Sequence, residues 1–368
     1  MKALVIIPHS KPSYELGFSA PISWLFTGLD EVFGIFSSEL TEDHIKSFDL
    51  FIIELNWHTE LYEFSIIVKY IKSIKKEAKI LFGGIYSQLK YKTIFEKYDI
   101  DYFIKGDNEV PIKLLLSGVD LKSIPNLVTR SFENSLEFIF KQSDYDNIDF
   151  DLSWFPSYFN LLKDEIDTDN SLFINPMIVS SKGCTTVHAG CDYCVGSKKG
   201  RDPVEISNEQ LISMLRKIEK KFKVATLYVI SPFVYDLKNE KFDMELHIEI
   251  DSKVDFDVFN NFVSSFRKTI SVIPLYKEGI MGNSMIEDVN RYRNIEGNHE
   301  VRFPARLSDE IKIKIEDKRN MLFNLEKVFT PIGAIFDSYM NDDFTKEVSY
   351  SVYRNTIHKL RKKFEWIK

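Results

Sequence analysis

Three consecutive segments decide the fold class of this chain: LFIIEL (residues 50–55), a helical stripe over residues 64–74, and KILF (residues 79–82). The first and third are continuous apolar runs, which are typical of strands buried on both faces of a parallel sheet. Between them, one apolar helix face is formed by Phe64, Ile67, Val68, Ile71 and Ile74. This strand–helix–strand unit predicts an α/β fold in which helices cover a parallel sheet.

Similar apolar runs extend the sheet on both sides of this unit. They are Ala3–Pro8, Val32–Phe36 and Asp101–Ile104, each bounded by polar or turn residues. We therefore expect one α/β domain over residues 1–122. In such a sheet, ligands bind beyond the carboxyl ends of the strands, so the loops after each run are candidate sites.

Residues 123–172 differ in composition and are expected to form a hairpin and a linker. Leu127–Thr129 and Leu136–Phe140 flank Asn134–Ser135, which predicts two hairpin arms with a turn between them. The stretch Ser143–Asn170 is rich in Asp and Asn, as expected of a linker between domains.

A second βα repetition begins near Phe173. Its expected strands are Met177–Ser180, Thr226–Ile230, Leu246–Ile250 and Thr269–Pro274. Ser207 followed by Gln210 resembles a capping box at the start of a helix, and a further helix is expected through Val258, Phe262 and Phe266. The pattern predicts a full or partial (β/α) barrel of the TIM type over residues 173–368, ending in a helical segment.

All three cysteines of the chain, Cys184, Cys191 and Cys194, lie in the loop SKGCTTVHAGCDYCVG (residues 181–196). Thiolates are the usual ligands of iron–sulfur clusters, and three of them leave the fourth iron of a four-iron cluster open for a small molecule. With His188, the same loop reads C-x3-H-x2-C-x2-C, which matches a closed Cys3His zinc set. From the residues alone, both a catalytic cluster and a structural zinc remain open.

The loop resembles the radical S-adenosylmethionine (SAM) superfamily, whose usual signature is C-x3-C-x2-C after the first barrel strand. Cys191 and Cys194 match the second spacing, whereas Cys184 stands three residues further away than usual. The resemblance implies a [4Fe-4S] cluster on the three cysteines, with SAM at the open iron. In the family, the residue at the position of Tyr193 commonly lies against the adenine of SAM.

Upstream segments look like those of cobalamin-binding radical SAM proteins. Residues 80–87, with Gly83 and Gly84, look like their strand and double glycine, and residues 101–109, with Gly106, look like their D-x4-G-E-x-E turn. Residues 124–128 resemble the segment that opens their hairpin, and residues 180–184 resemble S-x-R-G-C. The resemblance implies a flavodoxin/Rossmann-like N-terminal domain that holds cobalamin, with these three glycines as candidate contacts, followed by a partial barrel.

Three features of the family are missing from the sequence. No D-x-H-x-x-G motif is present for a lower cobalt ligand, and Ser231–Phe233 stands where Gly-Gly-Glu often contacts SAM. Gly279–Asn283 is only a loose echo of G-x-I-x-G-x-x-E. Glu249 ends an expected barrel strand and is a candidate for the ribose hydroxyls of SAM, with a solvated loop carboxylate as the alternative.

Composition limits the partners of this protein. The formal net charge of −7 argues against a general nucleic-acid binder. The apolar run after Lys2 is too short for a membrane span or a signal peptide. Clustered cysteines in odd number fit a reducing compartment, so a cytoplasmic protein with no membrane partner is expected.

These observations together predict a radical SAM enzyme, namely a transferase that methylates, or otherwise modifies by radical chemistry, a small-molecule or peptide substrate. Its expected cofactors are a [4Fe-4S] cluster, SAM and cobalamin, with an electron donor such as flavodoxin or ferredoxin. Two alternatives stay open. One is a radical SAM enzyme without cobalamin, and the other is a non-enzymatic two-domain binding scaffold stabilised by zinc on the three cysteines and His188.

Overall fold

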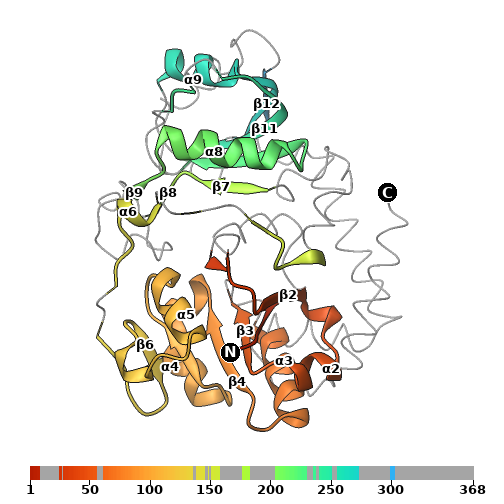
Figure 1. Cartoon of the computed structure of the whole chain (residues 1–368), viewed down its shortest axis with the longest axis vertical. Helices are drawn as coiled ribbons and strands as arrows, with labels where there is room; N and C mark the ends of the chain where they lie inside the picture. The colour runs from red at the N-terminus through yellow and green to blue at the C-terminus, as the bar shows by residue number, and fades with distance from the viewer. Residues whose placement is uncertain are drawn as a thin grey trace, which may run out of the picture.

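The computed structural model describes residues 1–8, 25–26, 28–55, 61–135, 138–145, 148, 151–157, 176–182, 204–229, 235–237, 240–250, 255–272 and 299–302. Within these residues, most strands belong to two sheets, which lie one above the other in Figure 1. None of the described helices has the length and apolar character needed to cross a lipid bilayer.

The first sheet has six described strands in the order β2-β1-β3-β4-β5-β6. They are β1 (Ala3–Ile7), β2 (Val32–Phe36), β3 (Leu50–Glu54), β4 (Lys79–Gly83), β5 (Tyr102–Ile104) and β6 (Leu127–Thr129). The first five strands pair in parallel, and β6 pairs antiparallel with β5. The order 2-1-3-4-5 is that of flavodoxin-like doubly wound sheets, so the predicted parallel α/β architecture is confirmed.

Helices cover both faces of this sheet. Ile53 and Phe82 face α2 (Glu42–Ser47), α3 (Leu61–Ile74) and α4 (Ile85–Lys97), in one apolar cluster. Their strand neighbours Ile52 and Leu81 face the other side, with α5 (Glu109–Leu116). Two short 3-10 turns, η2 (Ser37–Glu39) and η4 (Leu121–Ser123), complete the described elements of this half.

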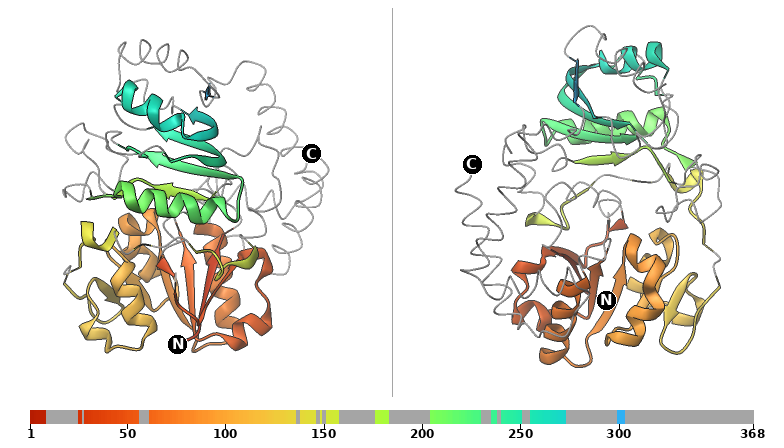
Figure 2. Two further views of the ribbon diagram at one scale, coloured as in Figure 1. Left: turned by 45° about the horizontal axis from the view of Figure 1, so that its top comes forward. Right: turned by 180° about the vertical axis from the view of Figure 1, so that it is seen from behind.

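The second sheet has five described strands in the order β7-β10-β11-β12-β13, and all neighbours pair in parallel. These are β7 (Met177–Val179), β10 (Val224–Val229), β11 (Phe242–Ile250), β12 (Phe266–Val272) and β13 (His299–Arg302). Helices α8 (Asn208–Glu219) and α9 (Phe256–Val263) run between successive strands (Figure 2). The predicted second βα repetition is thus present as a parallel sheet whose spatial order follows the chain.

A short connecting region joins the two sheets. It contains α6 (Gln142–Tyr145) and the antiparallel pair β8 (Ser181–Lys182) with β9 (Val204–Glu205). One continuous apolar core runs from the α5 face of the first sheet, through Tyr145 and Leu152, to α8 and the second sheet. The two sheets are therefore packed together by the linker rather than only tethered by it.

Two local predictions are corrected by the structure. The hairpin turn lies at Arg130–Ser131 rather than Asn134–Ser135, because the Thr129 hydroxyl accepts the backbone N–H groups that follow it and residues 132–135 already return along β6. Part of the expected second arm, residues 136–137, lies outside the described residues. Helix α9 ends at Val263, so Phe266 begins a strand instead.

The capping prediction is only half right. Ser207 caps α8 by accepting the N–H of Gln210 at 3.1 Å. The side chain of Gln210 does not return to the cap; it donates to the carbonyl of Ile148 in the linker. The polar side chain therefore stabilises the packing of the two halves instead of the helix end.

Gly34 in β2 is a sensitive point for this packing. Its N–H donates to the Trp154 carbonyl at 2.6 Å, and a Cβ added there would stand 2.7 Å from ring atoms of Trp154 and Phe155. We expect Gly34→Ala to lower the free energy of unfolding by about 1–3 kcal/mol, because the two rings must move. Urea unfolding measures this, and Gly83→Ala is the control, since no atom of the described residues lies within 4 Å of its added Cβ. Equal stability of both variants would contradict the close packing of the linker on β2.

Candidate cofactor and metal site

Two of the predicted glycines stand at the carboxyl end of β4. Gly84 has φ 115° and ψ 175° at the start of α4, a conformation that favours glycine. The carbonyl of Gly83 accepts the N–H of Leu55 at 2.6 Å, and its α-carbon faces open space. A backbone hydrogen bond thus holds this strand end in place. The space that a side chain at residue 83 would fill holds no atom of the described residues.

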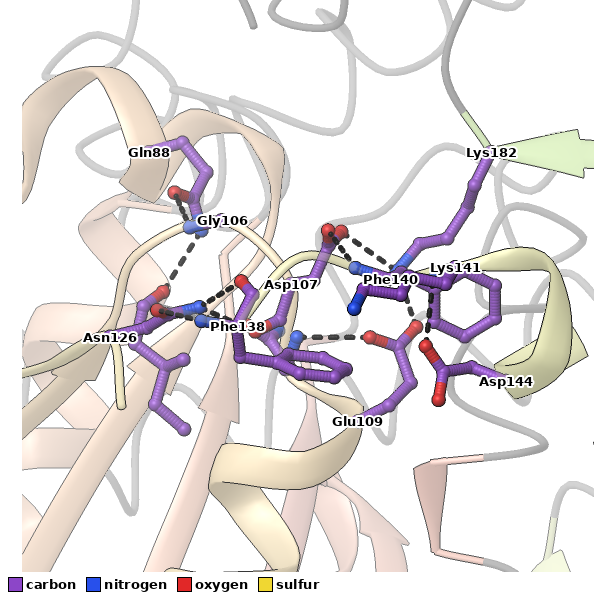
Figure 3. Close-up of polar contacts among 12 residues, drawn as sticks. Gln88, Gly106, Asp107, Glu109, Asn126, Phe138, Phe140, Lys141, Asp144 and Lys182 are labelled. Atoms are coloured by element: carbon purple, nitrogen blue, oxygen red, sulfur yellow. Dashed lines mark hydrogen bonds and ion pairs between the residues drawn. The ribbon is translucent and has the colours of Figure 1, made fainter. Parts of the chain in front are cut away.

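Gly106 lies at the end of the neighbouring strand β5, and Gln88 connects it to α4. The Gly106 N–H donates to Gln88 Oε1 at 2.8 Å, and Gln88 Nε2 donates to the Ile104 carbonyl at 3.1 Å (Figure 3). Gly106 has φ 70°, in the left-handed region that favours glycine. The structure therefore brings the three predicted glycines to one edge of the sheet, and Gln88, which the sequence did not single out, orders that edge.

The turn after Gly106 carries two carboxylates that bind Lys182. The ammonium of Lys182 lies 3.0 Å from Asp107 Oδ1, forms a second ion pair with Glu109, and stands 4.5 Å above the ring centre of Phe140 (Figure 3). Asp107 is 5% exposed, so little water screens this charge. Because Lys182 is two residues before Cys184, the ion triad fixes the start of the cysteine loop at the edge of the first sheet.

Backbone donors and Asn126 hold these carboxylates in place. Asp107 Oδ2 accepts the Phe140 N–H at 3.0 Å, and the Asn126 amide donates to the carbonyls of Asp107 and Phe138 at 3.3 and 2.8 Å. Asn126 has φ 63°, which asparagine tolerates better than most residues. Residues 138–140 are therefore bound along the turn that follows Gly106, and the ring of Phe140 lies against the ammonium of Lys182.

A second ion pair borders the same edge. Lys105 donates to Glu133 at 2.6 Å, and this hydrogen bond lowers the pKa of the Glu133 carboxyl. The hydroxyl of Tyr91 on α4 lies 3.4 Å from the same carboxylate, and burial raises the pKa of that hydroxyl. These contacts attach the return arm of the hairpin, at Glu133, to α4 and to Lys105, the residue before Gly106.

The linker also contacts the second half directly. Gln142 on α6 exchanges two hydrogen bonds with the backbone of Glu205, whose N–H donates to Gln142 Oε1 at 3.0 Å. The Tyr145 hydroxyl donates to the carbonyl of Val179, the last residue of β7, at 2.8 Å. The end of β7 is therefore fixed on the linker immediately before the cysteine loop begins.

The remaining predicted site residues are only partly placed. Cys184, Cys191 and Cys194 lie outside the described residues, as do Tyr193 and His188. The backbone of Glu249 lies in β11 in register with Tyr228 and Val272. Among the side chains that the structure describes, no group of three or more His, Cys, Asp or Glu is arranged to hold a metal ion.

Comparison with known proteins finds a likeness in structure alone. No known family profile matches the chain, and no curated protein matches its sequence. Two solved structures of the radical SAM methyltransferase TsrM from Kitasatospora setae are similar. One holds tryptophan and a SAM analogue, and the other holds cobalamin and a [4Fe-4S] cluster.

The TM-scores are 0.54 and 0.53 at 13% identity, over 82% of this chain. The match spans about two thirds of the TsrM chains, 67% and 66% of their lengths. At this identity the likeness establishes a shared fold, and the activity and cofactors of TsrM do not follow from it.

We expect the ion triad of Lys182, Asp107 and Glu109 to contribute measurably to the free energy of unfolding. We expect Lys182→Met to lower the free energy of unfolding by about 2 kcal/mol, between the values typical of exposed and buried pairs, because it removes the cation that Asp107 and Glu109 share. Lys182→Arg should restore most of this, since a guanidinium can serve both carboxylates. Urea unfolding measures both variants.

A matched control is Lys46→Met, which breaks the exposed pair with Glu42 at 3.2 Å and should change stability by less than about 0.5 kcal/mol. A double-mutant cycle of Lys182→Met with Asp107→Asn should give a coupling energy well above zero. If Lys182→Met behaves like the control, the triad does not hold the two halves together.

Proposed function

We propose that this protein is a radical SAM enzyme that holds a [4Fe-4S] cluster on Cys184, Cys191 and Cys194. The supporting observation is where the cysteine loop starts. It follows β7, the first strand of a parallel sheet whose strands are in chain order, and so begins at the carboxyl edge where βα proteins place their reactive groups. The chemistry of the donor set fits, because three thiolates with adjacent glycines can surround a cluster and leave one iron open.

The second sheet is proposed as the partial TIM-type barrel of this enzyme, over residues 173–368. Residues 1–122 would form the cobalamin-binding-like domain, and residues 123–172 the hairpin and linker. Tyr193 and Glu249 would contact SAM, by the resemblance to the family. When bound, the cluster supplies one electron that cleaves the carbon–sulfur bond of SAM.

Cobalamin is proposed at the carboxyl edge of the first sheet. Gly83 leaves open space there, and the backbone of Gly84 and Gly106 can approach a ligand closely because neither carries a side chain. Lys182 joins this edge to the start of the cysteine loop, so a ligand held over the first sheet would lie near the cluster. The solved TsrM structures with cobalamin and with a SAM analogue support this arrangement, which makes methyl transfer the proposed reaction.

The cluster assignment predicts a clear result in anaerobically purified protein. We expect about four irons and four sulfides per chain, and reduced protein should convert SAM to 5′-deoxyadenosine or use it as a methyl donor. Cys191→Ala should lose both the iron and SAM turnover, whereas His188→Gln should keep the iron. Colourless protein with one zinc, lost in both variants, would instead support the zinc scaffold.

The cobalamin assignment has its own test. Hydroxocobalamin should remain bound to the wild-type protein through gel filtration, and Gly83→Val should lose most of it because the valine side chain fills the open space. The urea midpoint of Gly83→Val should stay close to that of the wild type, which separates a filled site from a misfolded one. Iron-containing protein that binds no cobalamin would favour a radical SAM enzyme without this cofactor.

A further inference from the structure

Strand β11 has two chemically different faces. Its sequence, FDMELHIEI (residues 242–250), alternates strictly between apolar and polar residues. Met244, Leu246 and Ile248 lie in the apolar core with α8 and with Ala225 and Leu227 of β10. Since alternate residues of a strand face opposite sides, Glu245 and His247 lie on the face turned away from α8.

This polar face is buried, although such alternation usually indicates a face open to water. His247 is 1% exposed and Glu245 is 8% exposed. His247 Nε2 lies 2.7 Å from Glu245 Oε1, so the imidazole and the carboxylate share a hydrogen bond inside the protein. Burying two such groups costs free energy that an apolar pair would not, which is typical of positions kept for binding or chemistry.

Thr226 adds an unsatisfied hydroxyl to the same face. It pairs in register with His247 in the parallel ladder of β10 and β11, and register partners point to the same side. Thr226 is 2% exposed, and its Oγ1 has no hydrogen-bond partner within the described part of the chain. A buried hydroxyl can donate and accept, so this one is complementary to a polar group placed over the sheet.

Glu245 on this face has a cationic neighbour. Lys268 of β12 is in register with Glu245, and its ammonium lies 3.7 Å from Glu245 Oε2. The carboxylate therefore already has a cation beside it, which favours a neutral partner over a second cation at this position. A register shift in β11 between Phe242 and Glu245 marks the start of this face, and such bulges often re-aim side chains beside functional sites.

We propose that Thr226, Glu245 and His247 form a binding site for a neutral hydrogen-bonding group, such as a carboxamide or hydroxyl, of a small organic ligand. Thr226 is three residues before the end of β10, which sets the site roughly 10 Å below the carboxyl edge. The site goes beyond the proposed function, because neither the cluster nor SAM takes part in it.

Three isosteric probes test the proposal on the purified full-length chain. Benzamide is neutral, benzoate is its anionic counterpart, and benzamidine is its cationic counterpart. We expect ligand-observed NMR to show benzamide binding more tightly than either charged probe. Thr226→Val should weaken benzamide binding about fivefold, as expected for the loss of one hydrogen bond, and Thr226→Ser should restore it.

Thr269→Val is the matched control. Thr269 is 1% exposed and its Oγ1 also lacks a hydrogen-bond partner among the residues that the structure describes. It is in register with Leu246, however, and so lies on the α8 face. Both valine variants should fold with unchanged or slightly higher stability, and only Thr226→Val should weaken benzamide.

Three outcomes would overturn the site: benzamide that fails to bind, equal effects of both valine variants, or tighter binding of a charged probe. Benzamide binding that is insensitive to Thr226→Val would mean that the probe binds elsewhere on the protein, and it would likewise overturn the site. Because no outcome depends on metal content, a failed cluster and a failed ligand site are distinguishable.

Discussion

The relation between the two halves of this protein depends on one ammonium group. Lys182 lies between Asp107 and Glu109, with the Phe140 ring beneath it. The carboxylates follow β5 of the first sheet, and the lysine follows β7 of the second. The interaction therefore joins the carboxyl ends of two separate parallel sheets, where each sheet would bind its ligands. Without the counter-charge, the largely buried Asp107 would favour a rearranged turn, and the cysteine loop would lose its fixed starting point.

Contacts of the linker fix the position from which Lys182 reaches the two carboxylates. Asn126 orients residues 138–140 along the Gly106 turn, Tyr145 holds the end of β7, and Gln142 holds β9. These contacts use backbone groups as partners, so they fix direction as well as distance. An ion pair alone tolerates many orientations, whereas the combination permits little movement of Lys182. The hairpin and linker are thus part of the candidate site and more than a tether.

Sequence reasoning identified the strands because their apolar runs are continuous, and it placed Gly83, Gly84 and Gly106 at strand ends by resemblance. It failed where a short-range pattern competes with packing. Phe266 continues a helical stripe, yet it stacks on Phe242 in the neighbouring strand at 5.0 Å between ring centres. Gln210 fits a capping box, yet a linker carbonyl takes its amide. The partners of Lys182 are 73 and 75 residues away, so no local rule could pair them.

The buried polar face of β11 also shows what a local sequence pattern cannot predict. Alternation in residues 242–250 predicts one wet face, because a sequence pattern records polarity and not enclosure. Only the structure shows that Glu245 and His247 are enclosed, and that Thr226 from another strand lies beside them. Polar side chains on a strand face cost little in contact with water, but burying them costs free energy. That cost is the physical reason to look for a ligand at this face. The two candidate sites therefore arise alike: parallel strands bring together residues that are distant in the chain.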